Sequence, residues 1–301
     1  MKEGTPSWTA EWMAALRACG SLLLEDEILA DPFAKHFLSR RFSWLYSLAR
    51  LGIGPLNRGL TSLGERLLPG TLGWVLTRHR YIDDGVDEAV RAGATQVVIV
   101  GAGYDSRALR LPALSAVRIF ELDHPATQAR KKEIVLRIFG DLPKHIDYVS
   151  WDARQRDLQQ LPELGFDRDT KAVFVLEGFL WYMPPEVARA TLRSIAQVAA
   201  PGSVVLFDYI LPSVVDGTCT LEYAKETREQ LAKRGEPVLS GIEPEHLASY
   251  LRENGLRLIE DVGHDRLRER YMRSNRRKIK IYEFLRIARA ETDPAAPRLP
   301  S

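Results

Sequence analysis

An apolar run that ends in a glycine turn is the strongest chemical signal in this 301-residue sequence. Residues 97–100 lead directly into Gly101, Ala102 and Gly103, and a helical pattern follows. Glycine lets the backbone approach a ligand where a Cβ would collide, and the free N–H groups of a following helix favour negative charge. A dinucleotide-binding loop would carry a third glycine where this sequence has Ser106. The turn therefore predicts a ligand site without identifying the ligand.

Acidic residues follow the next two apolar runs. Residues 118–122 lead into Asp123, which stands 20 residues after Gly103, and Asp152 follows the third run with Ala153 beside it. An aspartate at the end of the second strand can hydrogen-bond both ribose hydroxyls. Asp152 is placed to bind an adenine amino group. The three strand ends together predict a site for an adenosine cofactor, which is either NAD or S-adenosylmethionine (SAM).

Two features favour SAM over NAD. About ninety residues precede the glycine strand, and the third glycine, which helps a helix pack over a pyrophosphate, is missing; SAM has no pyrophosphate. The fourth run ends in Glu177, an acid that can meet the SAM ammonium group, and the aromatic residues Phe179, Trp181 and Tyr182 after it can wall the methyl group. An NAD-dependent oxidoreductase and a SAM-binding protein without turnover are the alternatives.

Methyl transfer from SAM is an in-line displacement, for which a protein mainly aligns donor and acceptor and excludes water. It requires no metal. A carboxylate acceptor is already ionised at neutral pH, whereas a hydroxyl or enol must lose a proton to a base. The candidates for orienting or deprotonating the acceptor are Tyr182, Tyr209, Asp208 and His264, each at or just beyond a predicted strand end. The sequence does not identify the acceptor.

Four strings of the sequence resemble the leucine carboxyl methyltransferase family and its many bacterial SAM-dependent O-methyltransferases. They are residues 77–84 (TRHRYIDD), 101–111 (GAGYDSRALRL), 120–125 (FELDHP) and 177–183 (EGFLWYM), in the family's order and spacing. The resemblance covers roughly residues 8–290.

The resemblance implies a class I methyltransferase fold and a role for individual residues in SAM binding. Arg78 would bind the SAM carboxylate, Gly101 would line its methionine part, and Glu177 would face its amino group. Asp123 would hold the ribose and Asp152 would reach the adenine, as the strand ends also suggest. Arg17 matches a basic residue that the family places near the cofactor. His79 stands where bacterial relatives usually have threonine. The implied acceptor is a small molecule or a peptide C-terminal carboxylate.

The elements that must hold these residues begin near residue 96, where short apolar runs alternate with helix-length segments. This alternation is typical of a mostly parallel sheet covered on both faces. We expect strands at residues 96–100, 117–122, 147–150, 172–176, 204–209, 256–262 and 278–288, the last two forming a hairpin. We expect helices at residues 185–200, 218–234 and 244–254.

The segment before the sheet shows helical patterns over residues 8–17 and 31–42, without strand signals. Glycine and proline interrupt the sequence between residues 42 and 75. These breaks favour one interpretation of the segment, short helices that cap a pocket, and argue against the other, a single helix on a membrane surface. We therefore interpret the chain as four parts. They are a helical N-terminal cap at 1–90, a Rossmann-like SAM-binding core at 91–290, a lid insertion within it at about 210–242, and a flexible tail at 291–301.

Composition and charge exclude several classes of protein. The chain is 45% apolar and 27% charged, which is typical of a globular enzyme. Its formal net charge of +2 provides no field that would attract nucleic acid, and a basic cluster near residues 273–280 fits a solvated strand edge better than a phosphate-binding patch. Two distant cysteines and the absence of a long apolar run predict a cytoplasmic protein with neither a disulfide framework nor a membrane span. The oligomeric state is open.

Overall fold

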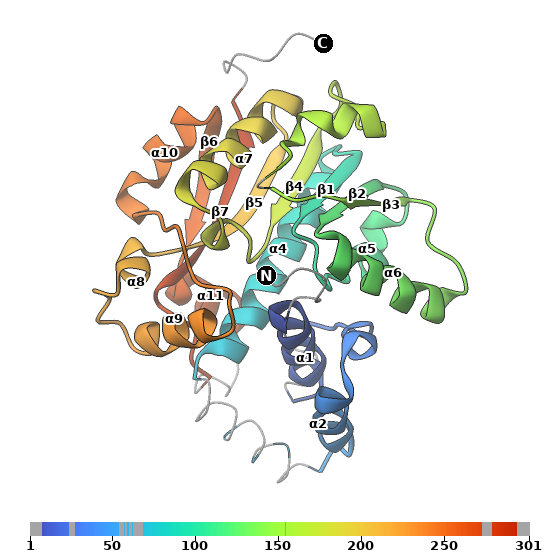
Figure 1. Cartoon of the computed structure of the whole chain (residues 1–301), viewed down its shortest axis with the longest axis vertical. Coiled ribbons are helices and arrows are strands. Elements are labelled where there is room, and N and C mark those ends of the chain that lie inside the picture. Colours follow the sequence, from blue (N-terminus) through green and yellow to red (C-terminus); the bar gives the residue numbers. More distant parts are fainter. Residues whose placement is uncertain are drawn as a thin grey trace.

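The computed structural model describes residues 8–23, 28–53, 69–153, 155–272 and 279–293, together with Asn57, Gly59 and Ser62. Within these residues the strands are β1 Gln96–Val100, β2 Arg118–Asp123, β3 Ile146–Ser150, β4 Ala172–Leu176, β5 Val204–Ile210, β6 Leu256–Val262 and β7 Leu285–Thr292. They form one sheet in the order β3-β2-β1-β4-β5-β7-β6. Strands β1 to β5 pair in parallel, and β7 runs antiparallel between β5 and β6 (Figure 1).

The helices connect the strands and also cover one end of the sheet. The α-helices are α1 Trp8–Leu23, α2 Arg40–Arg50, α4 Thr71–Arg91, α5 Arg107–Arg110, α6 Pro125–Phe139, α7 Pro185–Val198, α8 Pro212–Asp216, α9 Ala224–Lys233, α10 Leu247–Glu253 and α11 His264–Tyr271. The 3₁₀ turns are η1 Ala34–Phe37, η2 Pro112–Leu114, η3 Leu158–Leu164, η4 Leu180–Tyr182 and η5 Pro244–His246. Figure 1 shows α1, α2 and α9 at the same end of the sheet.

Local sequence explains several helix ends. Helices α6 and α7 both begin with proline, whose fixed φ suits the first helical position. Helix α6 ends at Gly140, which has φ +78° and closes the helix in the left-handed conformation that glycine adopts without strain. The chain is thereby returned to the sheet for β3.

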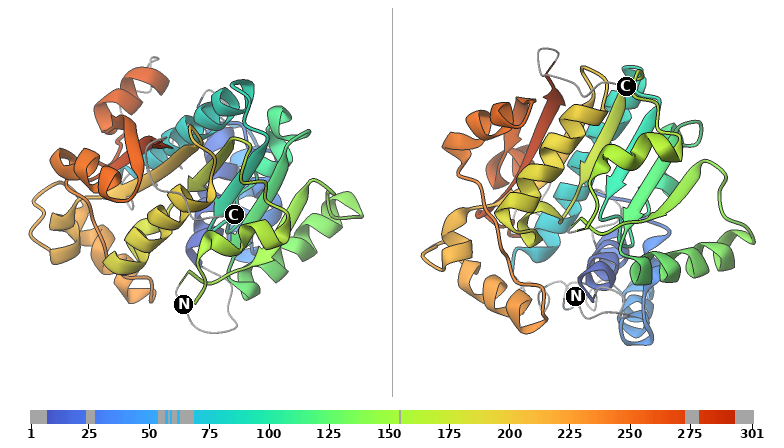
Figure 2. Two further views of the ribbon diagram at one scale, coloured as in Figure 1. Left: turned by 90° about the horizontal axis from the view of Figure 1, so that it is seen from above. Right: turned by 45° about the horizontal axis from the view of Figure 1, so that its top comes forward.

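Successive side chains of each strand point to opposite faces of the sheet and pack into two apolar layers, one on each face. Val97 and Ile99 of β1 pack with residues of α4, such as Ile82, while Val98 and Val100 pack with residues of α7, such as Leu192. All of these side chains are buried. Helices thus cover both faces, as Figure 2 shows, and this confirms the predicted α/β class with a mostly parallel sheet.

Most predicted strands are confirmed, but the predicted bounds of the last strand are wrong. Strands β1, β4 and β6 have the predicted bounds, and β2, β3 and β5 differ by a residue or two. The last strand begins at Leu285 and not at residue 278, which lies outside the described residues. It extends to Thr292, two residues into the segment expected to be a tail, because Thr292 is buried and bonded to Ser203.

The front segment also differs from its prediction. Residues 31–42 do not form one helix, since η1 is followed by extended backbone at Leu38 and Ser39 before α2 starts. Helix α4 falls within the predicted cap, yet it packs against β4 and β5 of the sheet. Among the described residues, no helix has both the length and the apolar character that a membrane crossing requires.

Candidate active site

A cavity of about 650 Å³ lies at the carboxyl end of the central strands, where ligands bind in open α/β sheets. Its walls come from α1, α4, the loops after β1, β2, β3 and β4, α9, and the segment after α9. Ten of the predicted site residues line it: Arg17, Arg78, Gly101, Ala102, Gly103, Asp123, Asp152, Ala153, Glu177 and Tyr182. The fold therefore brings together residues that are up to 165 positions apart in the chain (182 − 17).

The glycine turn after β1 forms one wall of this cavity. Gly101 has φ +69°, and a Cβ there would lie only 2.7 Å from a ring carbon of Phe179. Gly103 has φ +48°, and its N–H donates to Asp123 Oδ2 at 2.5 Å. The backbone N–H of His124 donates to the other carboxylate oxygen at 2.6 Å. Two backbone donors thus fix the Asp123 carboxylate at the cavity wall.

Burial raises the pKa of Asp123, and the backbone N–H groups of His124 and Gly103 offset only part of this effect. Next to it, Trp151 and Phe179 form an apolar surface with their ring centres 5.9 Å apart. Asp152 lies beside this surface. The region offers a carboxylate for hydroxyl groups and an apolar wall for a flat ring, as an adenosine requires.

Glu177 lies at the centre of a buried charged network. Its Oε1 is 2.9 Å from Arg78 Nε and 2.8 Å from His79 Nδ1, and its Oε2 is 2.7 Å from Arg107 Nη2. Arg107 is fully buried and also pairs with Asp105 and Asp83. The carboxylate is thus held by three cationic or polar partners from α4 and α5.

The charges in this network decide the protonation of its members. Burial alone would raise the pKa of Glu177, but His79, Arg78 and Arg107 outweigh burial and hold its pKa well below the usual range. Burial lowers the pKa of His79, with Glu177 opposing and Arg107 adding to the shift. Glu177 is therefore an anion at neutral pH, and its charge opposes the effect of burial on the pKa of His79.

Arg78 also bonds Asp208, whose Oδ2 lies 2.8 Å from Arg78 Nη1. Asp208 is fully buried and accepts a second bond from the N–H of Gly178 at 2.6 Å. Burial raises its pKa, and Arg78 opposes this shift. Asp208 thus positions Arg78 and does not face the cavity as a base.

Arg17 joins α1 to the glycine turn. Its Nη2 donates to the carbonyl oxygen of Tyr104 at 2.6 Å, and its Nε donates to Asp31 Oδ2 at 2.8 Å. Burial raises the pKa of Asp31, but Arg17 and Arg110 outweigh it and lower the pKa overall. The predicted contact of the front segment with the cofactor region thus has a structural basis in a buried ion pair.

Aromatic side chains line much of the cavity. Five of the six tryptophans of the chain line the cavity, namely Trp8, Trp12, Trp74, Trp151 and Trp181. Trp8 and Trp12 of α1 stack with their ring centres 5.8 Å apart. The segment after α9 closes over them, with Arg234 3.7 Å above the Trp8 ring and Glu236 bonded to the Thr9 hydroxyl.

Sequence patterns predict the lid at about 210–242 but do not reveal its contact residues. Glu236 and Arg234 stand in a polar stretch without a motif, and Thr9 lies 227 residues away from Glu236. The segment after α9 is also tied to η4, because Leu239 N–H donates to the carbonyl oxygen of Trp181 at 2.7 Å. The tryptophan at position 8 is the one signal in the sequence that could have pointed to these contacts.

Of the candidates for the acceptor chemistry, Tyr182 lines the cavity, while Tyr209 and His264 do not. The Tyr209 hydroxyl donates to Asp261 Oδ1 at 2.9 Å on the far side of β5, where Arg286 also contacts it. His264 begins α11 beside the edge strand β6. The main cavity therefore gives no support to the prediction that Tyr209 or His264 acts on the acceptor.

Burial, together with the charge of Glu236, raises the pKa of Tyr182. Its phenol therefore keeps its proton at neutral pH and is able to donate a hydrogen bond, but it is a poor base. Tyr182 is thus suited to orient an acceptor.

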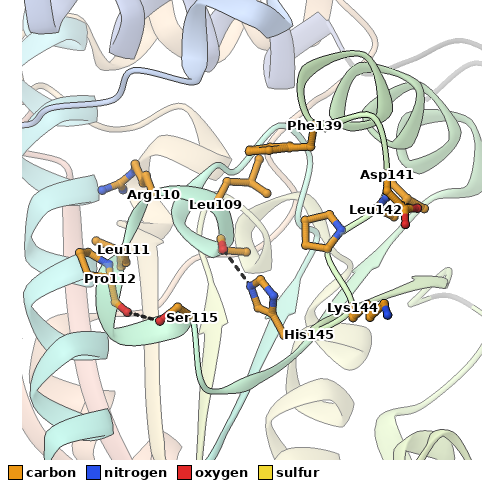
Figure 3. A pocket seen from close by; sticks show the side chains of 12 residues that line it. Leu109, Arg110, Leu111, Pro112, Ser115, Phe139, Asp141, Leu142, Lys144 and His145 are labelled. Atoms are coloured by element: carbon orange, nitrogen blue, oxygen red, sulfur yellow. Dashed lines mark hydrogen bonds between the residues drawn. The ribbon is translucent and has the colours of Figure 1, made fainter.

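A second hollow of about 500 Å³ lies between η2 and the loop that precedes β3 (Figure 3). His145 contacts the carbonyl oxygen of Ala108 there at 3.4 Å, and Ser115 donates to Pro112. The glycine turn and the Glu177 network lie outside its lining. It brings together none of the predicted site residues.

The residues of the main cavity fit SAM. The two glycines give a turn without side chains, Asp123 supplies a fixed carboxylate, and Glu177 supplies an anion for an ammonium group. In addition, the buried indole N–H groups of Trp74, Trp151 and Trp181 have no hydrogen-bond partner within the described part of the chain. Such donors are satisfied when a ligand brings acceptor atoms.

Comparison with known proteins agrees with this geometry. The family model for leucine carboxyl methyltransferase matches residues 10–196. A Mycobacterium sp. (strain JLS) protein named "Putative S-adenosyl-L-methionine-dependent methyltransferase" is 30% identical, and the match covers 83% of each chain. A Bacillus subtilis (strain 168) protein of the same name, YktD, is 27% identical over 70% of this chain and 69% of its own.

Solved structures show the same fold. A Thermobifida fusca protein titled a "putative methyltransferase" superposes with a TM-score of 0.59 at 14% identity, covering 97% of both chains. A Streptomyces avermitilis protein of the duf574 family has a TM-score of 0.54 at 13% identity, covering 79% of this chain and 91% of its own. The chain thus belongs to the leucine carboxyl methyltransferase family and is a SAM-dependent methyltransferase.

Proposed function

We propose that the protein transfers the methyl group of SAM to an oxygen atom of a small molecule, either a carboxylate or a hydroxyl or enol. The part of the cavity lined by Trp8 and Trp12 of α1 and covered by the segment after α9 carries this proposal. A site enclosed in this way suits a small acceptor with an apolar body better than the C-terminus of a folded protein. An NAD-dependent oxidoreductase is not favoured, because both the family match and the relatives are methyltransferases.

We assign the cofactor residues as follows. Arg78 and Arg17 hold the methionine carboxylate, Glu177 holds the ammonium group, and the turn from Gly101 to Gly103 lies along the methionine part. Asp123 binds the ribose, and Asp152 with Ala153 binds the adenine. When bound, SAM supplies a methyl group that is already activated by the sulfonium.

The chain's own contribution is orientation and the exclusion of water. Tyr182 keeps its proton and donates to the acceptor, which suits an oxygen that has lone pairs to offer. The tryptophans of α1 exclude water from the acceptor end. A carboxylate acceptor needs no base. For a hydroxyl acceptor, Glu236 is the lid carboxylate that lines the cavity and is able to take the proton.

The test is methyl transfer from SAM labelled in its methyl group to pairs of small aromatic and aliphatic acceptors that differ in carrying a carboxylate, a hydroxyl or an amine. We expect base-labile methyl esters or stable methyl ethers as products. The Tyr182→Phe variant should lower kcat by about tenfold while S-adenosylhomocysteine (SAH) binds as before. Methylation of the amines alone would refute transfer to oxygen.

A further inference from the structure

Three indole N–H groups in the cavity wall lack a hydrogen-bond partner within the described part of the chain. They belong to Trp74 of α4, Trp181 of η4 and Trp151, which follows β3. All three side chains are buried, with Trp74 only 2% exposed. An indole nitrogen donates and never accepts. Because a buried donor without an acceptor is costly, these groups indicate a ligand that carries acceptor atoms.

Two of these indoles, those of Trp74 and Trp181, lie beside Arg78. The guanidinium carbon of Arg78 is 5.8 Å from the centre of the Trp74 ring. Gly178 faces the same place, because a Cβ built on it would lie 3.7 Å from Arg78 Nη1 and 4.0 Å from Trp181 Nε1. The missing side chain of Gly178 therefore leaves a space bordered by a guanidinium and an indole N–H. Trp151 packs instead against Phe179, in the region assigned to the adenosine.

Arg78 by itself is a weak anchor for a further anion. Its nitrogens already lie 2.9 Å from Glu177 Oε1 and 2.8 Å from Asp208 Oδ2, so two protein carboxylates surround one cation. A third carboxylate would meet their repulsion. It needs further donors nearby that bring no additional negative charge. The Trp181 N–H borders the same space as Arg78 at Gly178, and the Trp74 ring lies against the Arg78 guanidinium.

We propose that Trp181 and Trp74 donate their indole N–H groups to the α-carboxylate of SAM, alongside Arg78, and so are binding residues for its methionine tail. The inference rests on the proposed assignment of Arg78 to that carboxylate. It explains why a guanidinium already neutralised by Glu177 and Asp208 is placed against the cavity. Both tryptophans thus have a role beyond filling space.

The test compares two ligands on variants that lose the indole N–H group together with part of the buried ring. SAH carries the carboxylate, while 5′-methylthioadenosine has the same adenosine and sulfur but lacks the amino-acid end. Calorimetric titration should show that Trp181→Phe and Trp74→Phe each raise the Kd of SAH by about tenfold. The Kd of methylthioadenosine should stay within twofold.

Trp44→Phe is the matched control, because Trp44 lies on α2 with 56% exposure and outside the cavity lining. It should change neither Kd. Unchanged SAH affinity in either cavity variant overturns the assignment of that tryptophan. An equal loss of both ligands shows a packing role and also overturns it. Failure of the unaltered protein to bind SAH would instead refute the proposed function.

Discussion

Replacing Glu177 by glutamine removes the charge at the centre of the buried network while keeping the size of the side chain. Glu177 is 10% exposed and accepts from Arg78, His79 and Arg107. Removing one partner of a buried ion pair costs about 3–5 kcal/mol, because the remaining charges are left uncompensated. We expect a loss of stability of this size.

The expected shift in melting temperature follows from chain length. For 301 residues the entropy of unfolding is about 0.6 kcal/mol/K, since each residue contributes about 2.1 cal/mol/K. A loss of about 3–5 kcal/mol therefore lowers Tm by about 5–8 °C. Calorimetric SAH binding should weaken in parallel, because the ammonium group loses its anion.

Thermal unfolding of the variant, followed by circular dichroism, checks this magnitude. The matched control is Glu186→Gln, at an exposed position in the first turn of α7. It should leave both Tm and SAH affinity unchanged. If Glu177→Gln melted within 2 °C of the unaltered protein and bound SAH equally well, the Glu177 carboxylate would neither stabilise the fold nor hold the cofactor.

Three further predictions follow from the site. Burial lowers the pKa of His79 in the folded protein, so below about pH 6.5 the unfolded chain binds a proton that the folded chain does not bind. The free energy of unfolding should therefore fall as the pH drops below about 6.5, by at most ~1.4 kcal/mol per pH unit. Urea titrations of His79→Gln should show a smaller fall, and an equal fall would exclude His79 as its source. Gly101→Ala places a Cβ 2.7 Å from Phe179 at φ +69°, which should cost about 1–3 kcal/mol and weaken SAH binding; a neutral result in both assays contradicts the need for glycine. Tyr209→Phe and His264→Gln lie outside the cavity and should leave SAH affinity within twofold, although Tyr209→Phe should lose about 1 kcal/mol of stability with its bond to Asp261; a tenfold loss of affinity in either variant would return that residue to the site.

The position of the proposed cofactor residues in the fold could be predicted because its signals are local. Gly101 and Asp123 stand directly at the ends of apolar runs, with Gly103 two residues after Gly101, and parallel strands bring such ends to one edge of the sheet. The strand order then places β2 next to β1, so that Asp123 meets the N–H of Gly103. The position of a residue next to the end of a predicted strand is therefore enough to place it at this edge of the sheet.

The acceptor side could not be predicted in the same way. Asp208 and Tyr209 are neighbours in β5, yet successive side chains point to opposite faces, so Asp208 reaches Arg78 while Tyr209 reaches Asp261. His264 follows β6, which the sheet order places farthest from β1 on that side. The sequence pattern does not reveal which face or which edge contains the site.

Contacts between segments that are far apart in the sequence could not be predicted either. Thr9 and Glu236 belong to segments without a shared motif, and their bond depends on how α1 and the lid pack. The pairing of Arg17 with Asp31 and Tyr104 likewise needs the folded α1. Only the general expectation of a cap and a lid could come from the pattern of helices.

Calorimetric titration with SAH and NADH, on the unaltered protein and on Asp123→Ala, tests the assignment of the main cavity to SAM most directly. We expect that one SAH binds per chain, that NADH does not bind, and that Asp123→Ala weakens SAH severely because the ribose loses its carboxylate. Binding of NADH without SAH, or equal SAH affinity in Asp123→Ala, would contradict that assignment.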